Sequence, residues 1–290
     1  MNTTNLHIPS NKVRDIERYI LAELHDLYPE AELKQMTRML FEAFLGWTTV
    51  DFLLHREGTI NQSDLLRFHW AVEDLKKQRP IQHIIGHTHF CDCRIEVSPD
   101  VLIPRPETEE IVQNLPHIEG PILDLCTGSG CIAIALSKNN PSVEVLGVDI
   151  SQQALAVAQR NNEANHTQAT FYQGDVLGTL PQPVGSRTYS LIISNPPYVM
   201  RSEAAQMEKN VLDYEPGLAL WVDDNDPLPF YRAITSFAAA HLRQGGLLVF
   251  EINQHLGRET AAMIEQHGFE CTIHDDFRGR PRSILATKKN

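Results

Sequence analysis

From Pro121 onward the sequence alternates short apolar runs with stretches of helical periodicity. The apolar runs are PILDLC, VEVLGVD, ATFYQGD, SLIISN and GGLLVFE, and helices are expected to begin between them near Gly130, Ser151, Glu203 and Pro227. Strands that are apolar on both faces and separated by helices form parallel sheets covered on both sides, so this pattern predicts an α/β fold. After Gly268, FECTIHDD and SILATKK predict a final antiparallel pair of strands.

Residues 12 to about 78 follow a purely helical pattern. Apolar residues recur there in three stripes at helical spacing: Val13, Ile16, Ile20, Leu24 and Leu27; Leu33, Met36, Leu40 and Phe44; and Leu65, His69, Val72 and Leu75. We therefore expect a helical domain over residues 1–80, with Trp47 and Trp70 packed in its core. Gly86 and the turn IPRPE predict a linker with a short hairpin at residues 81–107, before an α/β domain at residues 108–290.

The charge balance disfavours a nucleic-acid substrate. The chain has 25 Lys and Arg against 37 Asp and Glu, a formal net charge of −12, whereas binding to a phosphate backbone depends on basic residues that neutralise it. The five cysteines are an odd number, and we read them as reduced thiols. No apolar run of roughly eighteen residues and no signal-peptide core is present, so we expect a cytoplasmic protein without a membrane segment.

A glycine turn follows the first predicted strand and precedes a helix. In DLCTGSGCIA, Gly128 and Gly130 allow the backbone to turn tightly and approach a ligand near a helix N-terminus. Asp149 ends the second strand, where a carboxylate can accept hydrogen bonds from both ribose hydroxyls. Asp175 ends the third strand and either approaches an adenine ring or caps a helix. The glycine spacing, with Ala133, also fits nicotinamide dehydrogenases.

The sequence NPPY at the end of the fourth strand decides between these alternatives. Pro196 and Pro197 have no N–H to donate, and their stiff segment presents carbonyl acceptors beside the side-chain oxygen of Asn195. Two convergent acceptors match an NH₂ group, and Tyr198 offers a flat face for a planar amide or base. Acceptors of this kind stabilise the positive charge that grows on nitrogen during methyl transfer from a sulfonium. A hydride-transfer enzyme does not need such acceptors, so this sequence disfavours a dehydrogenase.

Several motifs together give the chain a specific resemblance. NPPY, DLCTGSG and GVDIS resemble the amino-group methyltransferases that use S-adenosylmethionine, and RPIQHIIGHTHF, VLIPRPETEE, ISNPPYV, YEPGLAL, GGLLVFEI and RGRPR follow the order found in peptide chain release factor glutamine methyltransferases. The resemblance implies a Rossmann-like methyltransferase fold with a mostly parallel seven-stranded sheet, an antiparallel C-terminal pair and a small all-helical N-terminal domain. That domain would recognise the substrate, because the sheet already accounts for the cofactor.

The same resemblance implies the site and the reaction. The cofactor S-adenosylmethionine would be contacted by Cys126, Thr127, Gly128, Ser129, Gly130, Asp149, Asp175, Val176 and Asn195. Asn195, Pro196, Pro197 and Tyr198 would bind the glutamine amide of the Gly-Gly-Gln loop of a release factor, with Asn195, Pro196 and Tyr198 as the catalytic set. The protein would therefore act in translation termination by protein methylation. Two positions depart from the family pattern: Asn253 replaces a usual glycine, and Val176 replaces a usual polar or aromatic residue.

Three other groups of residues have competing interpretations. A zinc site at His87, His89, Cys91 and Cys93 is disfavoured, because alternate residues of one strand stand too far apart for one tetrahedral ion, and no metal is expected. Arg105, Glu107 and Thr108 of IPRPET either start a helix or close over the cofactor. Arg278, Arg280 and Arg282 are expected in a solvated hairpin loop, with contact to an acidic or RNA-like partner surface as the alternative.

Three other functions remain open from the sequence. An adenine-N6 methyltransferase of DNA or RNA uses the same NPPY chemistry but needs basic contacts to the nucleic-acid backbone. A glutamine methyltransferase of a ribosomal protein is disfavoured by IPRPETE. A binding protein that has lost activity is disfavoured because every expected acceptor and glycine is present.

Overall fold

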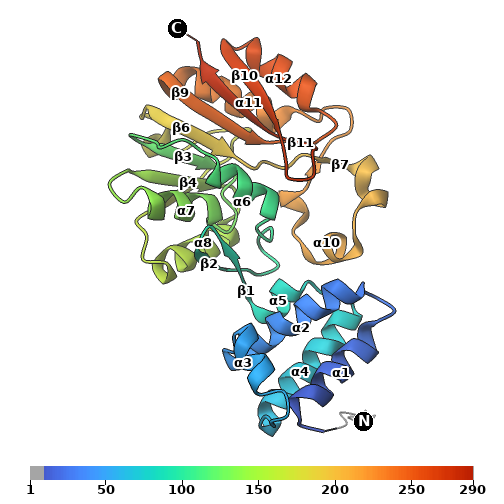
Figure 1. The fold of residues 1–290 in the computed structure, drawn as a ribbon. Helices are drawn as coiled ribbons and strands as arrows, with labels where there is room; N and C mark the ends of the chain where they lie inside the picture. Colours follow the sequence, from blue (N-terminus) through green and yellow to red (C-terminus); the bar gives the residue numbers. More distant parts are fainter. Residues whose placement is uncertain (1–9, 290) are drawn as a thin grey trace. The chain divides into compact units, whose positions relative to one another are not determined.

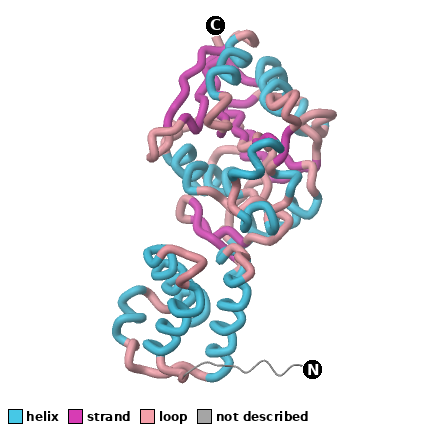
Figure 2. The backbone as a smooth tube through the Cα atoms, turned by 90° about the vertical axis from the view of Figure 1, so that its right-hand side faces the viewer, coloured by secondary structure: helices cyan, strands magenta, loops and turns pink. Residues whose placement is uncertain are grey.

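The computed structural model describes residues 10–289, and the chain divides after Gly86 into two compact units. The first unit is helical, whereas the strands of the main sheet and the helices that flank them belong to the unit that begins at His87 (Figure 1, Figure 2). The short helix α5 (Ile81–Ile85) ends at Gly86 and belongs to the first unit. None of the helices between residues 10 and 289 has both the length and the apolar character needed to cross a membrane.

The helical unit is built on the three apolar stripes of the sequence. Its longer helices are α1 (Val13–Leu24), α2 (Glu30–Leu45) and α4 (Gln62–Lys76), and α3 (Thr49–Leu54) begins with a capping box between Thr48 and Asp51. Nearly all residues of the stripes are buried in one cluster, against which Trp47 packs. Each helix therefore turns one apolar face to a common core.

Two residues expected in this core are exposed. Trp70 is 61% exposed, because it lies on the face of α4 opposite Phe68 and Val72. Leu27 is 42% exposed, because α1 already ends at Leu24. The expectation of burial was wrong for both residues.

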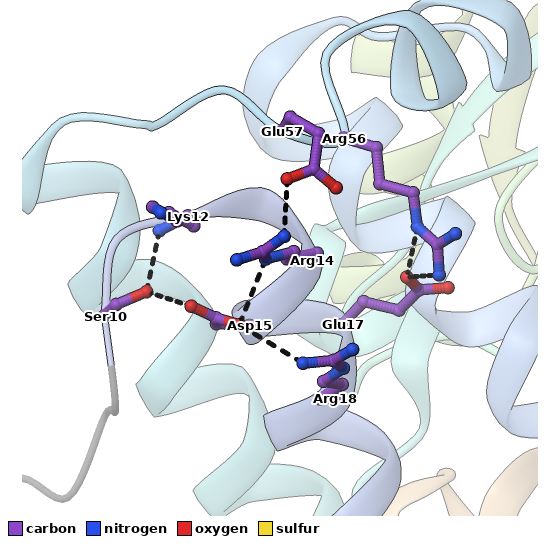
Figure 3. A network of polar contacts seen from close by, with 8 residues as sticks. All are labelled: Ser10, Lys12, Arg14, Asp15, Glu17, Arg18, Arg56 and Glu57. Carbon is purple, nitrogen blue, oxygen red and sulfur yellow. Dashed lines mark hydrogen bonds and ion pairs between the residues drawn. The ribbon is translucent and has the colours of Figure 1, made fainter.

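Polar contacts join the start of α1 to the loop after α3 (Figure 3). Arg14 pairs with Glu57 at 2.6 Å, and Arg56 pairs with Glu17 at 3.0 Å. Asp15 accepts a hydrogen bond from the Ser10 hydroxyl at 2.5 Å, which holds the pKa of its carboxyl below the usual value. Exposed pairs of this kind contribute little to stability, so they define how the loop lies on α1 while the buried stripes stabilise the unit.

The second unit contains a seven-stranded sheet in the order β10-β11-β9-β6-β3-β4-β5. Its strands are β3 (Ile122–Leu125), β4 (Val145–Asp149), β5 (Thr170–Gln173), β6 (Tyr189–Ser194), β9 (Leu242–Glu251), β10 (Phe269–Asp275) and β11 (Pro281–Lys288). Five neighbouring strands of this sheet, β9, β6, β3, β4 and β5, are parallel to one another. Strand β11 pairs antiparallel with both β9 and β10. This confirms the mostly parallel sheet with an antiparallel C-terminal pair.

Helices cover both faces of the sheet (Figure 1). One buried cluster contains residues of α6 (Pro106–Gln113), α7 (Cys131–Asn139) and α8 (Gln152–Ala164), and the other contains residues of α11 (Pro229–His241) and α12 (Gly257–Glu265). Successive residues of β6 alternate between them: Leu191 and Ile193 belong to the first, and Ile192 to the second. Burial on both faces explains why this strand is apolar throughout.

The chain between β6 and α11 is made of short elements. They are β7 (Val199–Met200), η1 (Arg201–Gln206), α10 (Lys209–Tyr214), η2 (Gly217–Ala219) and β8 (Trp221–Val222), and α9 (Gln182–Gly185) precedes β6. The helix expected near Glu203 is a 3₁₀ helix, and β7 and β8 form a small parallel pair of their own. A segment of this kind supplies a loop next to the end of β6 instead of a long helix.

The predicted hairpin consists of β1 (His87–Phe90) and β2 (Cys93–Glu96). Cys91 and Asp92 form its turn, both with positive φ, so Cys91 and the two histidines do not share a strand face with Cys93. In the described part of the chain, no group of three or more potential ligands is arranged to hold a metal ion.

Two asparagines of α8 attach β2 to the sheet domain. Asn161 accepts from the Glu96 amide at 2.7 Å and donates to the Glu96 carbonyl at 3.0 Å, and Asn165 does the same for Arg94 at 3.1 and 2.8 Å. Asn161 also donates to the Ser129 carbonyl at 3.0 Å. Residues four apart on a helix thus pair with residues two apart on a strand and provide the backbone partners that an edge strand lacks.

Candidate active site

One polar side chain stands at the carboxyl end of each of four adjacent parallel strands. Cys126 follows β3, Asp149 ends β4, Asn195 follows β6, and Asp175 lies two residues beyond β5. All four line a single cavity of about 360 Å³. In the sheet, β4 lies on one side of β3 and β6 lies on the other, so the strand order reverses at β3. Open α/β sheets bind their ligands at the carboxyl ends of the strands beside such a reversal.

The glycine turn forms the floor of this cavity. Gly128 and Gly130 have φ of +54° and +79°, which favour glycine. A Cβ on Gly128 would meet nothing within 4 Å, whereas one on Gly130 would lie 3.0 Å from Ala158 Cβ. Gly130 is therefore also required by packing against α8. Cys126 is held at φ +61°, and burial raises the pKa of its thiol, which favours the neutral form.

Asp149 is held by the backbone of the same turn. Its carboxylate accepts the Gly128 amide at 2.8 Å and the Ser151 amide at 2.9 Å. Burial raises the pKa of this carboxyl, and the amide hydrogen bonds oppose that effect. The carboxylate is thus oriented before any ligand arrives.

The NPPY segment is fixed by the last residues of β9. Asn195 and Pro197 line the cavity, Pro196 is buried, and the Tyr198 hydroxyl donates to Glu251 Oε1 at 2.9 Å. Burial raises the pKa of Tyr198, so this hydroxyl remains a donor. The structure therefore brings nine of the twelve predicted residues to the lining of one cavity, and Gly130, Pro196 and Tyr198 are not among the lining residues.

Comparison with known proteins identifies the family. The methyltransferase small domain matches residues 106–213, and the PrmC N-terminal domain matches residues 17–86. A release factor glutamine methyltransferase of Flavobacterium psychrophilum is 39% identical over 94% of this chain and 98% of its own length. That of Bacteroides thetaiotaomicron is 40% identical over 94% and 99%. The chain belongs to the release factor glutamine methyltransferase family.

The comparison with solved structures concerns the fold alone. A methyltransferase from Pyrococcus furiosus has a similar fold, with a TM-score of 0.52 and 16% identity over 79% of this chain and 100% of that chain. As a member of the release factor glutamine methyltransferase family, the protein is an enzyme, a methyltransferase that depends on S-adenosylmethionine. The predicted fold class, family and cofactor are confirmed.

The residues of the cavity fit this cofactor. Asp149 presents a carboxylate suited to a ribose diol, and Ile150 and Leu177, 45% and 50% exposed, turn apolar surface toward the cavity where an adenine ring would lie. Asp175 and Val176 line the same part. The carboxylate of Asp175 accepts the Leu177 amide at 2.9 Å, so it also caps its own turn.

An ion pair with a buried carboxylate joins two segments, IPRPET and YEPGLAL, on which the family resemblance rests. Arg105 of IPRPET donates to Glu215 Oε1 at 2.6 Å, and the Ile103 amide donates to Glu215 Oε2 at 3.1 Å. Glu215 belongs to YEPGLAL and is 7% exposed. Because Pro104, Arg105, Pro216 and Leu218 line the cavity, this pair holds its two sides together.

Sequence reasoning missed the polar residues behind NPPY. Glu251 was read only as the end of a strand and Asn253 only as a departure from the family pattern. In the structure, Glu251 is buried and bonded to Tyr198 and Thr108, and the Asn253 amide donates to the Tyr198 carbonyl at 3.2 Å. The only sequence signal was a charged residue at the end of an otherwise apolar run.

The three arginines of RGRPR differ in their exposure to solvent. Arg278 and Arg280 are exposed, as expected for a hairpin loop. The expectation is wrong for Arg282, whose side chain is 18% exposed and pairs with Asp276 at 3.4 Å. It lies on β11 beside the buried end of β9, where its positive charge acts on the pKa of Glu251.

Proposed function

We propose that this enzyme transfers a methyl group from S-adenosylmethionine to the side-chain amide nitrogen of the glutamine in the Gly-Gly-Gln motif of peptide chain release factors. The observation that carries the proposal is a single cavity lined by both Asp149, at the end of β4, and Asn195 and Pro197, at the end of β6. The carboxylate of Asp149 suits the hydroxyls of a ribose, and the segment of Asn195 and Pro197 suits an NH₂ group. Relatives named for this activity align over nearly the whole chain.

The geometry accounts for the chemistry of a weak nucleophile. The lone pair of an amide nitrogen is delocalised into its carbonyl, and bound S-adenosylmethionine supplies a methyl group on a sulfonium as a strong electrophile. Asn195 Oδ1 and the Pro196 carbonyl accept the two amide hydrogens and direct the nitrogen at the methyl carbon. With the cofactor bound, these oxygens would stabilise the positive charge that develops on the amide nitrogen as it takes the methyl group from the sulfonium. The methylated amide then loses one proton to water.

The remaining assignments follow from the same proposal. Cys126 to Ser129, Asp149, Asp175, Val176 and Asn195 line the cavity and contact the cofactor, and Gly130 shapes their turn. Asn195 and Pro197 line the part of the cavity that would receive the glutamine amide, and Pro196 and Tyr198 complete the same NPPY segment. The helical unit recognises the release factor, because the cofactor cavity lies wholly in the second unit. Release factors act where translation terminates, which places the enzyme in the cytoplasm.

The test is peptide mass spectrometry of a purified release factor incubated with the enzyme and S-adenosylmethionine, beside a release factor in which the glutamine of Gly-Gly-Gln is replaced by alanine. A gain of one methyl group confined to that glutamine is expected. Labelling of a ribosomal protein or of nucleic acid in its place would keep the chemistry of NPPY and refute the substrate.

A further inference from the structure

A chain of hydrogen bonds runs from Asn195 to a buried carboxylate. Asn195 Nδ2 lies 3.4 Å from Thr108 Oγ1, and Thr108 Oγ1 lies 2.5 Å from Glu251 Oε2. Thr108 is 3% exposed and Glu251 is 3% exposed, so water does not compete for these bonds. Thr108 belongs to the first turn of α6 and Glu251 ends β9, so the chain joins three elements at the edge of the cavity.

The chemistry of the end group fixes the direction of every bond in this chain. An ionised carboxylate only accepts, so the Thr108 hydroxyl must donate its single hydrogen to Glu251. Thr108 Oγ1 then offers only a lone pair to Asn195. The amide of Asn195 satisfies that lone pair with Nδ2, so this chain of bonds does not use its Oδ1.

The contacts of Glu251 favour its ionised form. Its second oxygen, Oε1, accepts the Tyr198 hydroxyl at 2.9 Å, so both oxygens are acceptors. Burial is the larger effect and raises the pKa of Glu251 above its ordinary value, while these two hydrogen bonds and the nearby charge of Arg282 partly offset it and support the ionised form. Glu107 is the nearby acidic group that opposes ionisation.

The same end of β9 also fixes Tyr198. Glu251 accepts the Tyr198 hydroxyl, and Asn253, two residues further, donates to the Tyr198 carbonyl at 3.2 Å and to Glu203 at 2.9 Å. The hydroxyl and the carbonyl of Tyr198 are therefore both held by the chain at and just beyond the end of β9. The carboxylate of Glu251 thus links the first and the last residue of NPPY.

We propose that Thr108 and Glu251 are positioning residues that lock the Asn195 amide with Oδ1 toward the cavity, so that it accepts a hydrogen of the amide undergoing methylation. Without this lock the amide can turn by 180° and present Nδ2, which repels the NH₂ group that it should accept. The inference rests on the proposed function for the identity of the substrate. It assigns a role to the threonine of IPRPET, which otherwise only begins a helix.

The test compares Thr108→Val, which removes the hydroxyl at nearly constant shape, with Thr108→Ser, which keeps it. For Thr108→Val we expect kcat on a release factor to fall about tenfold, because one orienting hydrogen bond is lost. KM for the release factor and the dissociation constant of S-adenosylmethionine should stay within about twofold, since the acceptor acts mainly in the transition state. Thr108→Ser should restore most of kcat.

Thr235→Val is the matched control. Thr235 is fully buried on α11, outside the cavity, and its hydroxyl has no hydrogen-bond partner in the described structure. The same chemical change there should leave kcat unaltered. A Thr108→Val enzyme with wild-type kcat, or a Thr108→Ser enzyme as slow as Thr108→Val, would overturn the proposal.

A double-mutant cycle with Glu251→Gln tests whether the two residues act through one chain of bonds. A glutamine amide can donate as well as accept, so Glu251→Gln frees the Thr108 hydroxyl to turn toward Asn195 and should lower kcat on its own. The double variant should be no slower than the slower single variant, within about twofold. If the two losses in kcat multiply in the double variant, the residues act independently, and the proposed chain of hydrogen bonds is refuted. Wild-type turnover on the release factor is measured first: its absence counts against the proposed function itself.

Discussion

Asp124 combines complete burial with an incomplete set of hydrogen bonds. Its Oδ2 accepts the Thr127 hydroxyl at 2.5 Å and the Ala133 amide at 3.2 Å, while Oδ1 has no partner in the described structure. Burial raises the pKa of this carboxyl to about 7. The protonated form is therefore the one that the fold favours at the end of β3.

This shift predicts how stability depends on pH. A carboxyl with a raised pKa in the folded state stabilises the protein fully below its unfolded pKa of about 4, and the contribution is lost as pH rises toward 7. The slope is at most about 1.4 kcal/mol per pH unit. Between pH 5 and 7 we expect the free energy of unfolding to fall by about 2 kcal/mol more for the wild type than for Asp124→Asn. Urea denaturation without cofactor measures this, and parallel pH profiles would contradict it.

Asn195→Ala tests the acceptor in the catalytic set. The substitution removes Oδ1 while leaving Asp149 and the glycine turn in place, so kcat should fall by about 10²- to 10³-fold, as for other preorganised groups that stabilise transition-state charge. The affinity for S-adenosylmethionine, measured by titration calorimetry, should change only a few-fold. Turnover equal to that of the wild type would remove Asn195 from its assigned role.

At this scale the sequence indicates that some residues of the cavity meet, and it gives no sign of other contacts. Asp149 and Asn195 could be placed together because each stands at the end of an apolar strand, and parallel strands bring such ends together. Thr108 and Glu251 were not predicted to interact, because 143 positions separate them and nothing local in the sequence indicates that they meet. Trp70 was wrongly placed in the core because an apolar residue type was given more weight than its helix face.

At the scale of elements, α8 connects the hairpin of β1 and β2 to the glycine turn through Asn161. This one side chain is 1% exposed and serves the Glu96 amide, the Glu96 carbonyl and the Ser129 carbonyl. Its loss leaves three backbone groups without their partner. Asn165, one helical turn later, makes similar bonds to Arg94 where water can replace them.

The two asparagines therefore form a matched pair of substitutions. Asn161→Ala should lower the free energy of unfolding by about 3 kcal/mol, because buried groups remain unsatisfied, and Asn165→Ala by about 1 kcal/mol or less. Only Asn161→Ala should also weaken S-adenosylmethionine binding, since Ser129 lines the cavity. Denaturant titrations and calorimetry check both effects. Equal losses from the two variants would refute this role of α8.

Strand positions were predicted well because burial on both faces leaves an uninterrupted apolar run, as in β6. The connection after NPPY was predicted less well. Its 3₁₀ helix and the short pair β7 and β8 have few residues and no periodic pattern, and they are fixed by single contacts such as Asn253 to Glu203. Periodicity alone does not reveal elements of two to six residues.

For the whole molecule, each unit has a buried cluster of its own. The cluster of the helical unit runs from Val13 to Ile81, and the two clusters of the sheet domain begin at Phe90 and Leu123. The cavity draws its lining only from Pro99 onward. The cavity proposed for the cofactor is thus formed by the second unit alone, which leaves the helical unit free for another task.

A fragment of residues 87–290 tests the proposed substrate recognition. Because the second unit has its own core, we expect the fragment to fold and to bind S-adenosylmethionine within about threefold of the full chain. Its kcat/KM on a release factor should fall more than about tenfold, mainly through a higher KM, if the helical unit binds the release factor equally well in the ground state and in the transition state. Circular dichroism and calorimetry establish folding and cofactor binding first. A folded fragment that methylates as efficiently as the full chain would show that the helical unit does not recognise the substrate, while the chemistry at Asn195 would stand.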